Sequence, residues 1–336
     1  MLERFTQRGH EEVLVLQDAA SGLRGVVAVH DSRVGPAMAA TRLRAHASLD
    51  AALDEALRVS EAVGQEAAMA GLSRGGAAAV FVGTAAAEKS RPFLAAYGRL
   101  LDRLDGRVLA LADMGFDSRD LTVLARMTKH VAHRRGAGGD VAELTAQGVF
   151  EGIRTAAERL EAPLDELHVA VQGLGQVGYR LARLLAAEGV RLTVADVDPG
   201  RVDRVRDELR ADAVDAAAIL EVEADVFSPN AGSGVLDEAA VDALRCRAVV
   251  GAARALLADP RQAEMLHARG VLYAPDFVAC GAGLAGLVGD DDEMAVQERV
   301  AEAGNRLQDV WARSRAEGVS PQHAAERMLE TRRPAR

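Results

Sequence analysis

Three glycines in one short segment constrain the fold of this chain more than any other feature of its 336 residues. The segment HVAVQGLGQVGYRLARLL (168–185) places Gly173, Gly175 and Gly178 in the pattern G-x-G-x-x-G, after a predicted strand and at the start of a predicted helix. The first glycine permits a tight turn, the second lets the backbone approach a pyrophosphate, and the third lets the helix pack against the strand. Because a helix N-terminus attracts phosphate, the segment predicts a dinucleotide-binding loop.

The residues around this loop predict which dinucleotide binds. Gln176 and Val177 belong to the same loop, and Asp196 ends the next predicted strand, 23 residues after Gly173. A carboxylate at this place accepts hydrogen bonds from a ribose 2′-hydroxyl and repels a 2′-phosphate, which favours NAD over NADP. Asp198 is a competing acid, but it lies beyond the strand. The alternative interpretation of the motif is a tight strand–helix turn that has lost its ligand.

The first part of the chain predicts a mixed α/β domain over residues 1–138. VLVLQD and RGVVAVHD are typical of two strands joined by a turn, and Ser48 is expected to cap a following amphipathic helix. The segment QEAAMAGLSRGGAAAVFVG (65–83) then combines the end of that helix, a glycine-rich loop and a buried strand. Such a loop brings backbone amides close to a ligand, yet the positions after Gly75 and Gly76 are alanines.

Strands and helices alternate in the second part of the chain, after a helix that Thr145 is expected to open. The strand candidates include LHVAVQG, RLTVADV, ADVFSPN, AVVGAA and VLYAPDFV. Alternation of this kind predicts a parallel sheet with crossover helices, here a Rossmann-like, doubly wound dinucleotide-binding domain over residues 139–300. Residues 301–336 are predicted to be helical, with a break at Gly318 and Pro321, and to pack back on the first domain.

Composition argues against several kinds of binding partner and indicates the cellular compartment. The chain has 49% hydrophobic and 27% charged residues and a net charge of −10, which argues against a nucleic-acid partner because phosphate backbones select basic surfaces. No stretch reaches the roughly 18 apolar residues of a membrane span. Two cysteines in a chain this long make neither a disulfide framework nor a cysteine-rich zinc site. We therefore expect a cytoplasmic protein without a metal site.

Six ordered segments carry a resemblance to the glutamate/leucine/phenylalanine/valine dehydrogenase family, above all to its leucine and valine branch. It spans nearly the whole chain, and it implies an NAD-dependent amino acid dehydrogenase fold, a first domain for substrate binding and dimerisation, and a homo-oligomer, a dimer or larger. The segments are GPAMAATRL, AAMAGLSRGGAAAV, LADMG, GGDVAELTAQGV, VQGLGQVG and DPRQAEMLHARGVLYAPDFV.

The family's functional residues transfer to this chain only in part. The resemblance assigns the catalytic aspartate to Asp113 and a threonine near the nicotinamide to Thr145, and it agrees with the cofactor glycines and Asp196. The family lysine that holds the substrate carboxylate falls on Glu66. The second family lysine, the general base, falls on Ala78.

Other departures surround the missing lysines. A family asparagine falls on Ala255, a glycine pair falls on Ala39 and Ala40, and Cys280 lies in a segment where the family has Asn-Ala-Gly-Gly. Of the 40 basic residues only two are lysines, but a drift from lysine to arginine keeps the charge, whereas Glu66 reverses it and Ala78 removes it. The changes therefore indicate relaxed or redirected selection at the site.

Three functional hypotheses follow from this pattern. The first is a divergent NAD-dependent oxidoreductase for a CH–NH2 or imine/keto-type substrate, with Asp113 as the main acid or base and without standard lysine-assisted deamination. The second is a non-catalytic NAD-binding paralogue that acts as a regulator or partner subunit. The third is a non-redox enzyme with bound NAD. Cys280 is interpreted as a buried, inert thiol rather than a reactive one.

Overall fold

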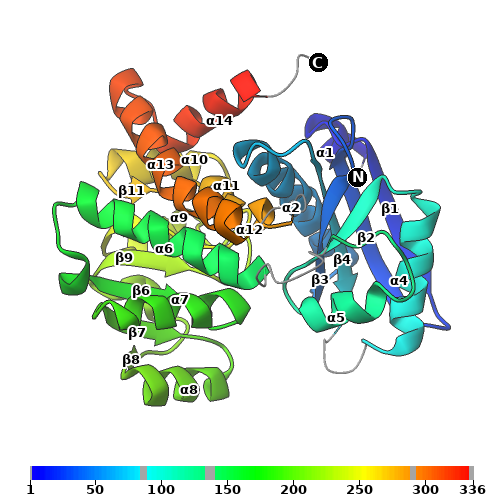
Figure 1. Cartoon of the computed structure of the whole chain (residues 1–336), viewed down its shortest axis with the longest axis horizontal. Coiled ribbons are helices and arrows are strands. Elements are labelled where there is room, and N and C mark those ends of the chain that lie inside the picture. Colours follow the sequence, from blue (N-terminus) through cyan, green and yellow to red (C-terminus); the bar gives the residue numbers. More distant parts are fainter. Residues whose placement is uncertain (1, 84–88, 133–140, 288–292, 333–336) are drawn as a thin grey trace. The chain divides into compact units, whose positions relative to one another are not determined.

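The computed structural model describes residues 2–83, 89–132, 141–287 and 293–332, and the chain divides into two compact units (Figure 1). Unit 1 comprises Met1–Gly136 with Pro334–Arg336, and unit 2 comprises Ala137–Arg333. The domain boundary predicted between residues 138 and 139 lies outside the described residues. Within the described ranges, no helix is both long and apolar enough to cross a membrane.

Unit 1 is built on a five-stranded mixed sheet with the order β1-β2-β4-β3-β5. β1 and β2 form an antiparallel hairpin, β2 pairs antiparallel with β4, and β3 runs parallel to both β4 and β5. This arrangement confirms the mixed α/β architecture and the strands predicted in this part of the sequence. The strands are β1 (Glu12–Asp18), β2 (Leu23–Asp31), β3 (Ala37–Arg44), β4 (Gly75–Val82) and β5 (Val108–Ala112).

Helices cover both faces of this sheet. A Cβ atom at Gly76 would lie only 2.2 Å from the carbonyl oxygen of Ser60, so α2 rests directly on the face of β4 that bears Gly76. Phe81 belongs to the opposite face, where it packs edge-on against Phe93 and Tyr97 of α4. The helices are α1 (Leu2–Gln7), α2 (Leu49–Met69), α4 (Arg91–Arg103) and α5 (Ser118–Leu124).

The predicted cap of α2 is confirmed. The Ser48 hydroxyl accepts a hydrogen bond from the backbone N–H of Ala51 at 3.1 Å, and Ser48 has an extended backbone. A serine here satisfies one of the N–H groups that the first helical turn leaves without an intrahelical acceptor. The cap therefore stabilises the start of this long helix at Leu49.

Unit 2 contains a six-stranded sheet with the order β11-β10-β9-β6-β7-β8, and every recorded pairing is parallel. This topology confirms the Rossmann-like, doubly wound prediction, because the chain starts at a central strand and winds outward in both directions. The strands are β6 (His168–Gln172), β7 (Arg191–Ala195), β8 (Asp212–Ala213), β9 (Ala224–Pro229), β10 (Cys246–Val249) and β11 (Leu272–Tyr273).

The helices of unit 2 enclose this sheet. α6 and α7 lie in front of it in Figure 1, and a hydrophobic cluster joins the strands to α9 and α10 through Phe227, Val241 and Leu266. The α-helices are α6 (Val141–Arg159), α7 (Gln176–Ala187), α8 (Pro199–Leu209), α9 (Glu238–Ala243), α10 (Arg261–Ala268), α11 (Asp276–Ala279), α12 (Gly281–Ala285), α13 (Glu293–Glu317) and α14 (Pro321–Arg332), with short 3-10 helices at Leu164–Glu166 and Ile219–Glu221.

Two local predictions in unit 2 were wrong. Thr145 does not open a helix, because α6 already begins at Val141 and the Thr145 hydroxyl donates to the Val141 carbonyl at 2.7 Å. The segment APDFV is not a strand. β11 ends at Tyr273, and Pro275, which has no N–H to donate to a sheet, precedes the short helix α11.

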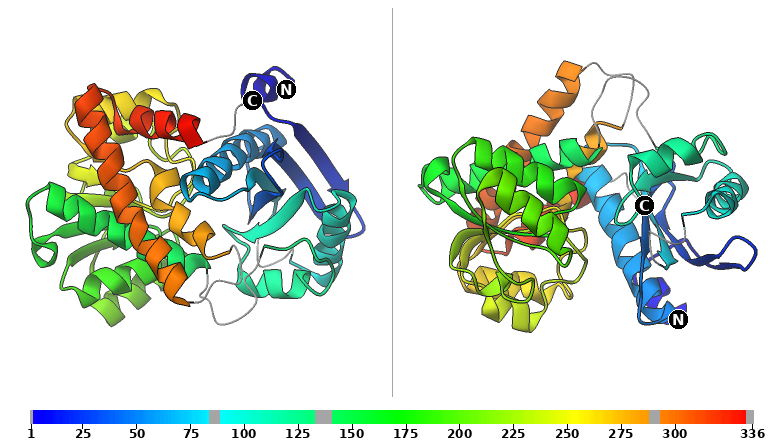
Figure 2. Two further views of the ribbon diagram at one scale, coloured as in Figure 1. Left: turned by 45° about the horizontal axis from the view of Figure 1, so that its top comes forward. Right: turned by 90° about the horizontal axis from the view of Figure 1, so that it is seen from below.

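The C-terminal helices pack within unit 2. α13 lies against α6, and α14 contacts α10 and β11 (Figure 2, where α13 is the long orange helix). The predicted break between them is confirmed, because Gly318 adopts φ +66° and Pro321 begins α14. Packing of residues 301–336 on the first domain stays a prediction.

Candidate functional site

The glycine-rich loop of unit 2 has backbone geometry that only glycine satisfies at two of its three positions. Gly173 has φ +87°, and a Cβ there would lie 2.5 Å from the Cβ of Ala231. A Cβ at Gly178 would lie 1.9 Å from the carbonyl oxygen of Gly173, far inside van der Waals contact. The turn between β6 and α7 is therefore as tight as the sequence pattern predicts.

Gly175, the middle glycine of the motif, leaves space above the loop. A Cβ at Gly175 would have Arg201 Nη1, at 3.9 Å, as its nearest non-neighbouring atom. Gly175 is the N-cap residue of α7, and no side chain caps this end of the helix. The first-turn N–H groups, at Gln176, Val177 and Gly178, thus have no intrahelical acceptor and suit a phosphate. The loop fits the pyrophosphate of NAD, with the helix N-terminus supplying hydrogen bonds and a partial positive charge.

Asp196 lies against this loop, as the sequence predicts for the ribose-binding acid. Its Oδ2 accepts a hydrogen bond from the backbone N–H of Leu174 at 2.6 Å, and its Oδ1 accepts one from the N–H of Asp198 at 2.9 Å. Asp198, the competing acid, instead caps α8 by accepting from the N–H of Gly200 at 2.9 Å. Asp196 therefore contacts the glycine-rich loop directly, whereas Asp198 caps α8, and the assignment of Asp196 to the coenzyme stays a prediction.

Two alanine substitutions should separate the roles of these glycines. We expect Gly175→Ala to leave the melting temperature unchanged, because its Cβ has room, and to raise the Kd for NADH about tenfold or more, equivalent to about 1.4 kcal/mol. Gly178→Ala should lower the melting temperature by several degrees, because its Cβ overlaps the Gly173 carbonyl. Thermal unfolding and calorimetry measure the two effects. Equal melting temperatures for both variants would contradict this assignment.

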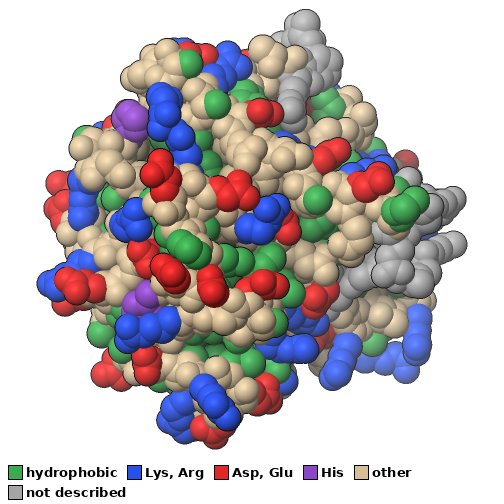
Figure 3. Space-filling model, turned by 60° about the vertical axis from the view of Figure 1, so that its left-hand side comes forward, with side chains coloured by type: hydrophobic (Ala, Val, Ile, Leu, Met, Phe, Trp, Pro, Cys, Tyr) green, Lys and Arg blue, Asp and Glu red, His purple; other side chains and the backbone are tan. Residues whose placement is uncertain are grey.

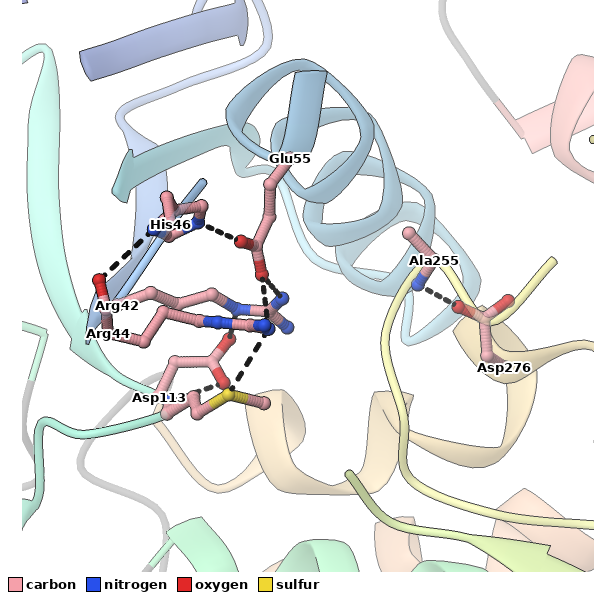
Figure 4. A network of polar contacts seen from close by, with 8 residues as sticks. Arg42, Arg44, His46, Glu55, Asp113, Ala255 and Asp276 are labelled. Carbon is pink, nitrogen blue, oxygen red and sulfur yellow. Dashed lines mark hydrogen bonds and ion pairs between the residues drawn. The ribbon is translucent and has the colours of Figure 1, made fainter. Parts of the chain in front are cut away.

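Asp113 of unit 1 follows the C-terminal end of β5, and hydrogen bonds to both of its carboxylate oxygens hold it in place. Its Oδ1 accepts from the backbone N–H of Met114 at 2.7 Å, and its Oδ2 accepts from Nε of Arg42 at 3.2 Å. Arg42 belongs to β3 and is 1% exposed. Its Nη1 donates to Oε1 of Glu55 on α2 at 2.6 Å, so one buried guanidinium joins two carboxylates from different elements (Figure 4).

Glu55 extends this network to a histidine. His46 Nε2 lies 2.5 Å from Glu55 Oε2, and His46 Nδ1 lies 3.1 Å from the carbonyl oxygen of Arg44 (Figure 4). Burial by itself would raise the pKa of Glu55, but the hydrogen bond with His46 and the charge of Arg42 outweigh it and hold that pKa well below its usual range. Glu55 is therefore an ionised, buried carboxylate at neutral pH.

Arg42, Glu55 and His46 were not predicted from the sequence to be site residues. One signal was available, because Glu55 stands between the apolar positions Ala52 and Val59 on the buried side of a predicted helix. A charged residue inside an apolar stripe needs a buried partner. Nothing in the local pattern says which residue that partner is.

The two positions matched to the family lysines both lie inside unit 1. Glu66 is on α2 and Ala78 is in the middle of β4, each with 0% exposure. Ala78 pairs in register with Ala28 of β2 and with Ala40 of β3. Since side chains alternate along a strand, Arg42 lies on the same face of the sheet as Ala40 and Ala78. This face bears a paired arginine next to Asp113 and has no titratable atom at position 78.

Three further residues from the sequence analysis lie in unit 2. A Cβ at Gly283 would be 2.1 Å from Thr145 Oγ1, so the Thr145 hydroxyl is packed beneath α12. Ala255 has φ +51°, and its N–H donates to Oδ2 of Asp276 at 2.6 Å; burial raises the pKa of Asp276. Cys280 is 0% exposed, as the interpretation of an inert thiol requires.

Comparison with known proteins places this geometry in a family. Residues 10–130 match the model of the Glu/Leu/Phe/Val dehydrogenase dimerisation domain. The chain is 33% identical over 332 residues to leucine dehydrogenase of Geobacillus stearothermophilus, covering 96% of this chain and 90% of the relative. It is 36% identical over 338 residues to valine dehydrogenase of Streptomyces coelicolor, covering 97% and 93%.

A solved structure agrees with these sequence matches. The crystal structure of L-tryptophan dehydrogenase from Nostoc punctiforme superposes with a TM-score of 0.73 at 33% identity and covers 98% of this chain and 97% of that one. The likeness therefore extends over both units and not over the dimerisation domain alone. The chain belongs to the Glu/Leu/Phe/Val dehydrogenase family and is an amino-acid-dehydrogenase-like oxidoreductase with NAD as its cofactor.

Proposed function

We propose that the chain is a divergent NAD-dependent oxidoreductase that acts on a CH–NH2 compound, or on the matching imine or ketone, without lysine-assisted deamination. One observation carries this proposal: Asp113 is held by the buried Arg42, while the positions matched to the two family lysines are Glu66 and Ala78. The acid is retained and oriented, and the two amino groups are replaced.

Three side chains of unit 1, those of Asp113, Arg42 and Glu55, are assigned roles in this reaction. Bound at the glycine-rich loop, NAD would supply a hydride acceptor for the carbon that carries the amine. Asp113 is the titratable side chain that we assign to the accompanying proton, and its Oδ1 and Oδ2 are both fixed by hydrogen bonds. Arg42 orients Asp113 and is itself anchored by Glu55. We therefore assign Asp113 as the acid or base, and Arg42 and Glu55 as positioning residues.

A second candidate function is a non-catalytic NAD-binding paralogue, acting as a regulator or partner subunit. It is favoured by Ala78, a fully buried methyl group where the family has its general base. Such a protein would keep the glycine-rich loop and Asp196, because coenzyme binding alone requires them. The two candidates differ only in whether a substrate changes the redox state of the bound coenzyme.

A substrate-dependent change at the NADH absorbance band distinguishes the two candidates. We expect at least one compound in a panel of primary amines, amino acids and 2-keto acids with ammonia to produce it. Asp113→Asn should lower the rate by about 10²–10⁴ while the Kd for NADH stays within about twofold. Full activity in this variant would show that Asp113 is not the acid or base. If no compound in the panel changes the NADH absorbance although NADH binds tightly, the non-catalytic paralogue is supported.

We also propose that the chain forms a homo-oligomer, a dimer or larger. Support comes from the matched family model, which describes a dimerisation domain and covers residues 10–130. Light scattering coupled to gel filtration measures the mass directly. A mass near 35.4 kDa, that of one chain, would overturn the proposal.

A further inference from the structure

Arg201, in the first turn of α8, lies between the end of β7 and the glycine-rich loop. Its Nη1 is 3.7 Å from Oδ2 of Asp196, and its Nε is 3.4 Å from Oδ2 of Asp198. The same Nη1 is 3.9 Å from the place where a Cβ of Gly175 would stand. A guanidinium group therefore occupies the end of the coenzyme site where the sequence predicts the adenosine ribose.

The guanidinium of Arg201 is available to a ligand. Its two recorded contacts are ion pairs at 3.4 and 3.7 Å, and among the described residues it donates no side-chain hydrogen bond to protein. The side chain is 52% exposed. Acidic and basic side chains mix over α8, at the bottom of Figure 3. Arginine offers planar, paired N–H donors that match a phosphate group, and at Arg201 these donors face solvent at the mouth of the loop.

Asp196 is turned inward at the same place. Each of its oxygens already accepts a backbone N–H, from Leu174 and from Asp198, and its side chain is 5% exposed. An acid at this position serves a ribose 2′-hydroxyl, and an arginine nearby accommodates a 2′-phosphate. This chain has both groups within 4 Å of each other, so the charge of Asp196 is offset where a 2′-phosphate would approach.

We propose that Arg201 makes the coenzyme site accept NADP(H) in addition to NAD(H), by pairing with the 2′-phosphate at the adenosine end. NADH stays the preferred coenzyme. The two negative charges of Asp196 and Asp198 exceed the one positive charge of Arg201, so the net local charge still repels a 2′-phosphate. The inference depends on coenzyme binding at the glycine-rich loop and is independent of which reaction follows.

Calorimetry with NADH and NADPH on the full chain tests this inference. For the unmodified protein we expect both to bind, with the NADPH Kd larger by about tenfold or less. Arg201→Ala should raise the NADPH Kd about tenfold and the NADH Kd less than about twofold, since the removed charge would pair with the 2′-phosphate, a group that NADH lacks, in a solvent-exposed setting. Arg201→Lys should retain part of the NADPH binding, because it keeps the charge but loses the paired N–H donors.

Arg204 provides the matched control on the same helix. It stacks on the ring of Tyr179 at 3.9 Å and pairs with Glu208, so Arg204→Ala should leave the ratio of the two Kd values unchanged. Binding of NADH without measurable binding of NADPH would overturn the role of Arg201 and leave the coenzyme site intact. Equal weakening of both coenzymes by Arg201→Ala would also overturn it, because Arg201 would then contact the shared adenosine. Failure of both coenzymes to bind would remove the site itself.

Discussion

Purified protein supplied with NAD and leucine, valine, phenylalanine or glutamate should form NADH at least about 10³-fold more slowly than a lysine-bearing relative. A general base contributes roughly 10²–10⁴ in rate, and Ala78 has no titratable group. Removal of one partner from a buried charge pair costs about 2–5 kcal/mol, and at Glu66 a carboxylate would in addition face the substrate carboxylate. Initial rates at the NADH absorbance band, measured beside the relative, test this expectation.

Restoring both amino groups should return only a trace of this activity. In Glu66→Lys/Ala78→Lys, Asp113 and the coenzyme loop are still in place, but position 78 is fully buried between Ala28 and Ala40. A catalytic lysine needs room and surroundings that lower its pKa, and Ala40 and Ala255 indicate that these surroundings have changed. The variant Glu66→Met/Ala78→Met adds similar bulk without charge and should show no such trace.

Deamination of these four amino acids by the unmodified protein, at a rate close to that of the lysine-bearing relative, would contradict the proposed loss of the family reaction. It would mean that Asp113, or another group near it, replaces both lysines. Glu66 and Ala78 would then be compatible with the family reaction, and the proposal that this chain lacks lysine-assisted deamination because its chemistry has changed would be rejected. NAD binding at the glycine-rich loop would be unaffected by that outcome.

Loss of Glu55 should cause the largest change in stability of any single substitution in the unit 1 network. Glu55→Leu removes a carboxylate that lies 2.6 Å from Nη1 of Arg42, and Arg42 is 1% exposed. Breaking a buried pair by removing one partner costs about 3–5 kcal/mol. Denaturant unfolding should show this loss as a lower midpoint. The double variant Arg42→Met/Glu55→Leu should recover part of the lost stability, because it contains no buried guanidinium that has lost a compensating carboxylate.

A surface pair on the same helix provides the comparison for this variant. Glu61 of α2 contacts Arg8 at 3.1 Å, and both side chains are partly exposed. Glu61→Ala should change the free energy of unfolding by about 0.5 kcal/mol or less, since exposed ion pairs contribute little. Equal losses for Glu55→Leu and Glu61→Ala would show that the buried network does not stabilise unit 1.

The same network should make stability depend on acid. The folded-state pKa of Glu55 is held below the ordinary glutamate value of about 4.3. Because this pKa is lower in the folded state than in the unfolded state, ionised Glu55 stabilises the fold at any pH above its unfolded-state pKa. This contribution is lost as the pH falls from the unfolded-state pKa toward the folded-state pKa. Unfolding midpoints measured from pH 6 down to about pH 3 should therefore fall more steeply for the unmodified protein than for Glu55→Leu.

The sequence by itself determined the features that depend on neighbouring residues. The turn at Gly173, the close approach at Gly178 and the cap at Ser48 are set by backbone sterics and by hydrogen bonds within a few residues, so a local pattern identifies them. Alternation of strands and helices likewise predicted the parallel sheet of unit 2, because crossover connections allow few other arrangements.

Only the tertiary structure decided which distant side chains meet. Arg42 and Asp113 are 71 residues apart in the chain, and Arg42 and Glu55 come from a strand and a helix; they pair because strand register and helix packing bring them to one buried face. The ionised state of Glu55 follows from that meeting and not from its neighbours in sequence. Local signals also failed at Pro275 and Thr145, where a helix begins after the proline and before the threonine, because a helix boundary depends on packing as well as on residue type.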